Sequence, residues 1–349
     1  MKPLADSRRH FASDNYSGAC PEVMAALQAA NLDHTPSYGD DPWTACATDL
    51  IRAQFEIDCD VFFVFNGTAA NALSLASLCQ SYHRVICYGH NHLASDECGA
   101  PGFFAHGITL QLLASPDGKL TTRQVEAAVK ARTDIHHNKA SALSITQATE
   151  LGTVYSLDEV SALGSACRRL GLGFHMDGAR LANAIASLNC RPRAVTWEAG
   201  VDVVSLGGTK NGLLAAEAVV FFNRDLARDF EYRRKQAGQL SSKMRFIAAQ
   251  WIGALETSAW LRNAQHANAM AERLEKGLSH INGARILYGR QANAVFVALP
   301  EKVCEQLRQR GWMFYNDVGP DRAARLMCSW DTTEADVDGF VHDVADVMK

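Results

Sequence analysis

An aspartate and a lysine each follow a short apolar run near the middle of this 349-residue chain. Asp177 comes after the run GFHM, and Lys210 comes after VDVVSLGGT. Short apolar runs bounded by glycine are typical of buried parallel strands, and in open α/β sheets chemistry gathers at the carboxyl ends of such strands. A helix-length segment separates the two runs, which is the pattern of one strand–helix–strand unit. We therefore expect the carboxylate and the amine to face each other across a crevice.

A buried carboxylate and a buried amine can form no more than an ion pair, and this interpretation stays open for the pair taken alone. The alternative is a pyridoxal 5'-phosphate site. There the lysine forms a Schiff base, and the carboxylate keeps the pyridine nitrogen protonated so that the ring accepts electrons. Such a site also needs a cradle for the phosphate, a group stacked on the ring and an anion site for a substrate carboxylate.

A phosphate cradle is indicated where the strand expected at residues 61–65 runs into Asn66, Gly67 and Thr68. The Ala-rich segment that follows is a good helix former. A glycine turn and a hydroxyl at a helix start offer free backbone N–H groups at the positive end of the helix dipole, which bind phosphate. An ordinary strand–helix turn uses the same residue types, so the segment alone supports both interpretations.

A ring-stacking group and an anion site have one candidate each. His92 follows the strand expected at residues 84–88, and Arg325 lies in the strand expected at residues 324–330. A histidine at a strand end is more often a surface or core residue, but in a cofactor crevice it can lie flat on the ring. A guanidinium can hold a carboxylate through two hydrogen bonds, whereas a surface arginine is the simpler interpretation of this segment. His90 and His92 lack the i, i+4 spacing of helical metal ligands, so we predict no metal site.

The composition is that of an ordinary globular protein, with 48% hydrophobic and 21% charged residues. A formal net charge of −4 provides no basic surface for nucleic acid, and the longest apolar runs are too short to cross a membrane. The ten cysteines show no CxxC pair, and the N-terminus MKPLADSRRH lacks the apolar segment of a secretory signal. We therefore expect a cytoplasmic protein with reduced thiols.

The order of apolar runs predicts an α/β fold with two domains. Strands alternate with helices through residue 222, which favours a mostly parallel sheet flanked by helices. A long helical region at residues 226–278 follows, with an interruption near Gly238. The last stretch indicates a small α+β domain, including a strand at residues 312–315. We expect an N-terminal arm and cover at 1–45, a large cofactor-binding domain at 46–250 and a small C-terminal domain at 251–349.

Several short motifs occur together in this chain: YGDD, FNGTAAN, HLASDECGAPG, ITQATELG, HMDGAR, GGTKN and KQAGQLSSKMR. With these motifs in this order, the chain resembles the low-specificity L-threonine aldolases of the fold type I pyridoxal phosphate enzymes. The likeness is greatest to the Pseudomonas-type branch, which includes phenylserine aldolases, and it extends from SDNYSG at 13–18 to CSWDTT at 328–333. The resemblance implies cleavage of L-threonine, L-allo-threonine and related L-3-hydroxy-α-amino acids to glycine and an aldehyde.

The resemblance also implies a role for each residue at a matching position. Those that would hold the cofactor are Gly67 and Thr68 at the phosphate, His92 on the ring, Asp177 at the pyridine nitrogen, Arg180 at the ring hydroxyl and Lys210 in the Schiff base. Phosphate contacts from a neighbouring subunit would involve Lys235 and one of Lys243 and Arg245. The cations of this segment are shifted relative to the better-known branch, so either of the last two is a candidate.

Residues implied to meet the substrate are Ser13 and Arg325 at its carboxylate, His136 near its hydroxyl, and Tyr38 from the neighbouring subunit. His137 follows His136 directly and leaves a one-residue ambiguity. A histidine found elsewhere in the family is replaced here by Thr149-Glu150, so no base role is carried over to that position. The implied assembly is a homo-oligomer, a tetramer built from dimers with shared active sites.

The implied reaction breaks the Cα–Cβ bond while a base takes the β-hydroxyl proton. An imidazole suits this work near neutral pH. We favour His92 as the base, with His136 positioning the hydroxyl. Three rival interpretations remain: another fold type I enzyme such as a β-eliminating lyase or aminotransferase, a pyridoxal-binding regulator without turnover, and a cofactor-free lysine aldolase on a β/α barrel. The preferred aldehyde and the threo or allo preference are not determined by the sequence.

Overall fold

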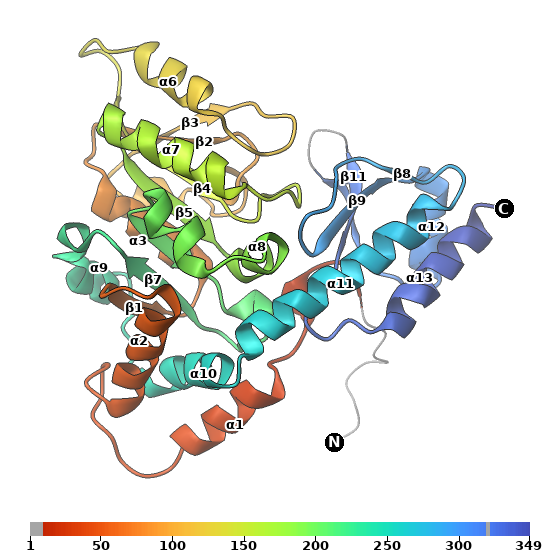
Figure 1. The fold of residues 1–349 in the computed structure, drawn as a ribbon, viewed down its shortest axis with the longest axis horizontal. Coiled ribbons are helices and arrows are strands. Elements are labelled where there is room, and N and C mark those ends of the chain that lie inside the picture. Colours follow the sequence, from red (N-terminus) through yellow and green to blue (C-terminus); the bar gives the residue numbers. More distant parts are fainter. Residues whose placement is uncertain (1–9, 319–321) are drawn as a thin grey trace.

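The computed structural model describes residues 10–318 and 322–349, which form a large α/β part and a smaller α+β part (Figure 1). The large part is built on a seven-stranded sheet with the order β1-β7-β6-β5-β4-β2-β3. Its strands are β1 (Asp60–Val64), β2 (His83–Tyr88), β3 (Thr109–Leu113), β4 (Lys139–Thr146), β5 (Gly173–Gly178), β6 (Val203–Leu206) and β7 (Glu217–Phe221). Within this sheet β7 is antiparallel to both neighbours and all other pairs are parallel. The prediction of a mostly parallel sheet is confirmed.

Helices cover both faces of this sheet because successive residues of a strand point to opposite sides. Phe174 and Met176 of β5 join the apolar core beneath α7, whereas His175 and Asp177 point to the side where α3 lies. The helices of the large part are α1 (Pro21–Ala30), α2 (Pro42–Phe55), α3 (Gly67–Leu78), α4 (His92–Ser95), α5 (Ala100–Phe104), α6 (Thr122–Lys130), α7 (Leu157–Leu170), α8 (Leu181–Leu188), α9 (Phe230–Gln236) and α10 (Arg245–Glu256). The side of the sheet that faces α3 is therefore the one on which polar side chains gather.

The smaller part is an antiparallel sheet of order β10-β11-β9-β8 packed against three helices. Its elements are α11 (Ala259–Ser279), β8 (Arg285–Ile286), β9 (Ala294–Ala298), α12 (Glu301–Gln309), β10 (Tyr315–Val318), β11 (Ala323–Met327) and α13 (Glu334–Val347). Figure 1 shows α11 running from the large part into the small one. The first turns of α11 pack in the core of the large part, and its later residues, from Met270 on, pack in the core of the small part.

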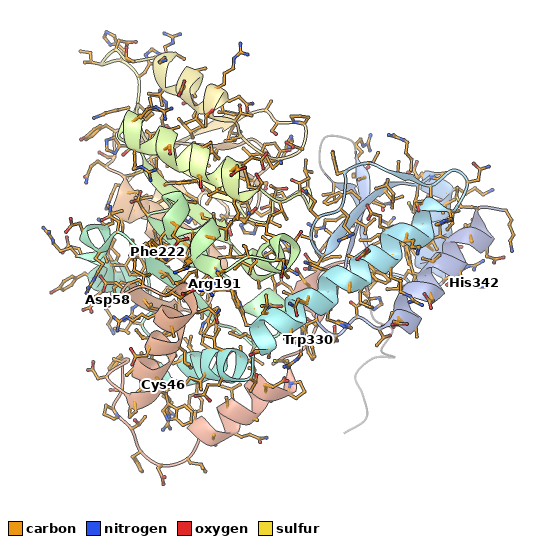
Figure 2. The ribbon with its side chains drawn as sticks, in the orientation of Figure 1. Cys46, Asp58, Arg191, Phe222, Trp330 and His342 are labelled. Carbon is orange, nitrogen blue, oxygen red and sulfur yellow. The ribbon has the colours of Figure 1, made fainter. Side chains whose placement is uncertain are left out.

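The N-terminal segment ties the two parts together. The buried ring of Phe11 packs in the small core, and its backbone N–H and C=O bond to Met313 and Met327. Trp330, labelled in Figure 2 where the two parts meet, donates from Nε1 to the carbonyl oxygen of Gly18 at 2.9 Å. The residues just after Phe11 are therefore held at the junction.

Strands of the small part differ from the prediction in their bounds, and the strand expected at residues 324–330 is Ala323–Met327. The strand expected at residues 312–315 begins only at Tyr315, because Trp312 and Phe314 are buried in an aromatic cluster with Phe340. The domain boundary expected after residue 250 falls inside α10, which packs against α1 and α2. Across residues 10–318 and 322–349, no helix is long and apolar enough to cross a membrane.

Candidate active site

A pocket lies at the carboxyl edge of the parallel strands, where α3, α4, α8 and the turn after β6 begin. Parallel strands bring their carboxyl ends to one edge, so residues far apart in the sequence meet there. Six of the residues predicted to hold a cofactor line this pocket: Gly67, Thr68, His92, Asp177, Arg180 and Lys210. The fold therefore brings together the predicted cofactor-binding residues that do not depend on a second subunit.

Asp177 is the second-to-last residue of β5 and is almost fully buried, and its carboxylate accepts hydrogen bonds from two donors. Oδ1 accepts from the backbone N–H of Ala179 at 3.0 Å, and Oδ2 accepts from Nδ2 of Asn71 at 2.9 Å. Lys210 lies in the short 3-10 turn after β6 and lines the same pocket, but no ion pair joins its amine to Asp177. The geometry favours a site that holds a ligand between the two groups over a simple buried ion pair.

The start of α3 presents hydrogen-bond donors to the pocket. Asn66 caps the helix, with its side-chain oxygen accepting from the backbone N–H of Ala69 at 2.8 Å. The amides of Gly67 and Thr68 precede the first intrahelical bond and lack an acceptor within the described chain. A Cβ at Gly67 would meet no atom within 4 Å, so it would extend into open space. This end of the pocket has the donors and the room that a phosphate requires.

His92 is linked to Asp177 through two buried side chains. Its Nδ1 is 2.8 Å from Oε1 of Glu97, and the same oxygen accepts from Nδ2 of Asn71 at 2.8 Å. The Glu97 side chain is 0% exposed. The hydrogen bond to Glu97 raises the pKa of His92 above its ordinary value, and burial raises the pKa of Glu97. Because Nδ1 donates to the carboxylate, Nε2 of the neutral ring is the nitrogen left to accept a proton.

Arg180 forms a bidentate salt bridge with Asp14 of the N-terminal segment. Its Nε and Nη2 donate to the two carboxylate oxygens at 2.7 and 2.9 Å. Burial opposes the charge of Asp14, but the charge and hydrogen bonds of Arg180 hold the pKa of this carboxyl below its ordinary value. Asn293 of the small part also donates to Asp14. One carboxylate thus joins the pocket, the N-terminal segment and the small part.

Ser13 and Arg325 do not line the pocket themselves, and both make hydrogen bonds within the N-terminal segment, whose Asn15 does line it. The Ser13 hydroxyl accepts from the backbone N–H of Asn15 at 3.1 Å, and Nη2 of Arg325 donates to the carbonyl oxygen of Ala12 at 3.3 Å. The buried Nε of Arg325 has no acceptor in the described part of the chain. Burial, followed by the charge of Arg180, lowers the pKa of Arg325. A buried, unpaired donor atom on a half-buried guanidinium fits an anionic ligand group.

His136 does not reach this pocket, which corrects the expectation that it lies near the substrate hydroxyl. It lies exposed three residues before β4, and the pocket is at the other end of that strand. Eight residues of strand at about 3.3 Å each separate the two ends by more than about 20 Å. The backbone N–H of His136 bonds to Asp134, and the neighbouring His137 side chain does the same.

The four residues expected to serve a neighbouring subunit lie outside the pocket. Nζ of Lys235 is 4.7 Å from the centre of the Tyr38 ring, and the backbone N–H of Tyr38 bonds to Ser242 beside Lys243. Arg245 donates to the carbonyl oxygen of Asp33 at 3.1 Å. Tyr38 is 47% exposed. The roles of these residues in a second copy of the chain remain predictions.

Several residues that line the pocket were given no role in the sequence analysis, among them Asn71, Ser205 and Glu217. Ser205 pairs with Asp177 in the sheet and accepts or donates a hydrogen bond at 3.1 Å to Nε2 of buried His175. A signal for the other two existed in the sequence. Asn71 interrupts an Ala- and Leu-rich helix, and Glu217 interrupts the apolar run AAEAVVFF. A polar residue inside an apolar run needs a partner, and here the partner is the site.

Comparisons with known proteins agree with this geometry. The sequence profile of the β-eliminating lyase family matches residues 10–302. A low specificity L-threonine aldolase of Pseudomonas sp. is 52% identical over 345 residues, covering 99% of each chain, and that of Pseudomonas aeruginosa matches equally well. The solved structure of Leishmania major threonine aldolase superposes with a TM-score of 0.91 at 27% identity, covering 97% of this chain and 99% of that one.

Proposed function

The chain belongs to the β-eliminating lyase family, and we propose that it is a pyridoxal 5'-phosphate-dependent aldolase that cleaves L-threonine, L-allo-threonine and related L-3-hydroxy-α-amino acids to glycine and an aldehyde. The observation that carries the proposal is one pocket that holds Lys210, Asp177, His92 and the start of α3 in a chain 52% identical to aldolases of this kind. Bound pyridoxal phosphate supplies an electron sink for the bond that breaks.

The residues of the pocket fit this cofactor. The free amides of Gly67 and Thr68 and the Thr68 hydroxyl are suited to the phosphate. Asp177, with its carboxylate held in place, would keep a proton on the pyridine nitrogen, and Lys210 would form the covalent link. Arg180 lines the same pocket beside them. None of these side chains needs to leave its present strand end or helix start.

The substrate would be held by its carboxylate, at the unpaired Nε of Arg325 and the Ser13 hydroxyl. Fixing the carboxylate orients the bond to be broken, and orientation selects which bond breaks. Nε2 of His92 would take the β-hydroxyl proton, because Glu97 holds the proton on Nδ1. We assign no step to His136, given its distance from the pocket.

The assembly we propose is a homo-oligomer, with tetramers built from dimers. Exposed Tyr38 and the cations Lys235, Lys243 and Arg245 lie close together on one surface, and a second copy would bring them to the pocket. The ten cysteines are all free thiols, which supports the proposal of a cytoplasmic protein.

The first experiment identifies the products of the purified protein, with pyridoxal phosphate and L-threonine. We expect glycine and acetaldehyde in equal amounts, and loss of both in Lys210→Ala. Pyridoxamine phosphate would identify aminotransfer instead, and 2-oxobutanoate with ammonia would identify elimination; either result would reject the proposal.

A matched pair of variants tests which histidine takes the proton of the substrate β-hydroxyl. We expect His92→Asn to lower the turnover of L-threonine by about 10² to 10⁴-fold with the cofactor still bound, which is the usual contribution of a general base. His136→Asn should retain the wild-type rate, because that side chain is a strand length away. The opposite ranking would contradict the assignment of His92.

A further inference from the structure

Glu217 lines the cofactor pocket close to both the start of α3 and the turn that carries Lys210. It is the first residue of β7, and it pairs with Val64, the last residue of β1. Because β7 runs antiparallel to its neighbours, its first residue lies at the edge where β1 and β6 end. The chain after β1 leads to the start of α3, and the chain after β6 leads to Lys210. Glu217 therefore lies beside both, and it lines the pocket.

The Glu217 carboxylate holds the turn that precedes Lys210. Its Oε2 accepts from the backbone N–H of Gly208 at 2.7 Å, and its Oε1 is 3.4 Å from the N–H of Thr209. The Thr209 hydroxyl accepts in turn from the backbone N–H of Ala216 at 3.3 Å. The two residues before the lysine are thus tied to β7 through side chains on both segments.

This turn fits against β7 with no spare room. A Cβ at Gly208 would lie 2.4 Å from the carbonyl oxygen of Ala216 and 2.6 Å from Cδ2 of Leu213. Only glycine allows the backbone to come this close. The position of Lys210 is therefore set by the start of β7, where Glu217 is the one ionisable residue of the strand.

Glu217 is 8% exposed, and no cationic side chain pairs with it in the described part of the chain. Burial raises its pKa to about 7, against the hydrogen bonds from Thr209 and Gly208 and the charge of Lys210. Asp14, by contrast, is paired with Arg180, and its pKa is lowered. Both carboxyls respond to the charge of Lys210, but only Glu217 changes its own charge near neutral pH.

Other ionisable groups also face the lysine. The charge of Lys210 acts on His92 of α4 and on Asp14 of the N-terminal segment. Asp177 of β5 and Arg180 line the same pocket. Asp14 is paired with Arg180, and His92 is bonded to Glu97, whereas Glu217 has only backbone amides and a hydroxyl as partners. Asp177 likewise accepts only from a backbone amide and from Asn71, so Glu217 and Asp177 are the two buried carboxyls of the pocket without a cationic partner among the described residues.

We propose that Glu217 is a positioning residue for Lys210, whose carboxylate fixes the Gly208–Thr209 turn and supplies the negative charge that stabilises the protonated lysine nitrogen. This inference rests on the proposed function, because it concerns the lysine that would carry the cofactor. The charge of Lys210 acts on Glu217, and opposite charges that interact in a buried site shift each other's titration by about one unit or more. Removing the Glu217 charge should therefore make the lysine nitrogen lose its proton at lower pH.

The test is a pH titration of the visible absorbance of the holoenzyme, from about pH 5.5 to 9.5, in the wild type and in Glu217→Gln. The chromophore reports the protonation of the nitrogen of Lys210, independently of turnover. We expect the midpoint to move to lower pH in Glu217→Gln by up to about one unit, because Glu217 carries its charge above about pH 7. Asp202→Asn is the matched control, because Asp202 also accepts from a backbone amide, that of Phe174, but at the opposite edge of the sheet. Its midpoint should equal that of the wild type.

Glu217→Asp separates charge from shape. It keeps the charge but withdraws it from the turn, so its midpoint should lie between those of the wild type and Glu217→Gln. A purely structural role predicts the reverse order, because glutamine preserves the length of the side chain. Should Glu217→Gln fail to fold in thermal unfolding, Glu217→Asp decides alone.

A wild-type midpoint in Glu217→Gln, or in Glu217→Asp where that variant decides, would overturn the inference while leaving the proposed aldolase intact. A wild-type protein that forms no chromophore with pyridoxal phosphate would overturn the proposed function, and the inference with it.

Discussion

Replacing Glu97 with glutamine should shift the pH dependence of the reaction without dismantling the pocket. In the structure, Oε1 of Glu97 accepts from Nδ1 of His92 and from Nδ2 of Asn71, each at 2.8 Å. The amide oxygen of glutamine can accept both hydrogen bonds, so the ring keeps its orientation and its Nε2 remains free. What is lost is the negative charge on a side chain that is 0% exposed.

The size of the effect follows from that hydrogen bond. A hydrogen bond to a charged group contributes about 1.5–3 kcal/mol, and one between neutral groups about 0.5–1.5 kcal/mol. The difference of about 1 to 1.5 kcal/mol corresponds to about one pKa unit. Because Glu97 raises the pKa of His92, Glu97→Gln should lower it by about that amount. His92 would then be unprotonated, and able to act as a base, at lower pH than in the wild type.

The assay is kcat/KM for L-threonine between about pH 5.5 and 9.5, with saturating pyridoxal phosphate. We expect the acidic limb of the profile to move about one unit to lower pH in Glu97→Gln, with a lower plateau because the base is weaker. Glu97→Leu removes the acceptor as well, and its plateau should fall toward that of His92→Asn. The reasoning is refuted by an acidic limb that stays in place or moves to higher pH in Glu97→Gln.

Three further perturbations test the fold around the site. Burial lowers the pKa of His175 to about 4, so between about pH 6.5 and 4 the unfolded state binds a proton at this residue and the folded state does not. As the pH falls through this range, the free energy of unfolding should therefore decrease by about 1.4 kcal/mol per pH unit. Urea unfolding at several pH values should find a smaller slope in His175→Asn. Gly208→Ala should lower the free energy of unfolding by about 1–3 kcal/mol or more, because the added Cβ would lie 2.4 Å from the carbonyl oxygen of Ala216. Gly67→Ala should leave thermal unfolding unchanged and weaken cofactor binding, measured by fluorescence titration. Equal stability of the two variants would contradict the packing argument. Asp14→Ala should cost about 3–5 kcal/mol in urea unfolding, because it leaves the guanidinium of Arg180, 11% exposed, without its counter-ion; a loss below about 1 kcal/mol would show that water replaces the carboxylate.

The sequence by itself predicted which residues line the pocket and at which edge of a sheet they meet. Asp177 lies near the end of β5 and Lys210 follows its parallel neighbour β6, while Gly67 opens the helix after β1, which runs in the same direction as β6. Apolar runs and glycine turns are local signals, and parallel strands end at one edge of a sheet. The proximity of these residues could therefore be predicted without knowing how the rest of the chain packs. His92, at the start of a helix after β2, was found in the same way.

Only the tertiary structure decided which further side chains lie in the pocket or bond to the predicted site residues. Asn71 links Asp177 to Glu97 because α3 crosses the face of the sheet to which Asp177 points. His136 is excluded because β4 carries the chain a full strand length before it reaches the pocket. Glu217 is included because β7 runs in the reverse direction and starts at the pocket edge. Helix placement and strand direction depend on packing across the whole fold, and local patterns of residues do not encode them.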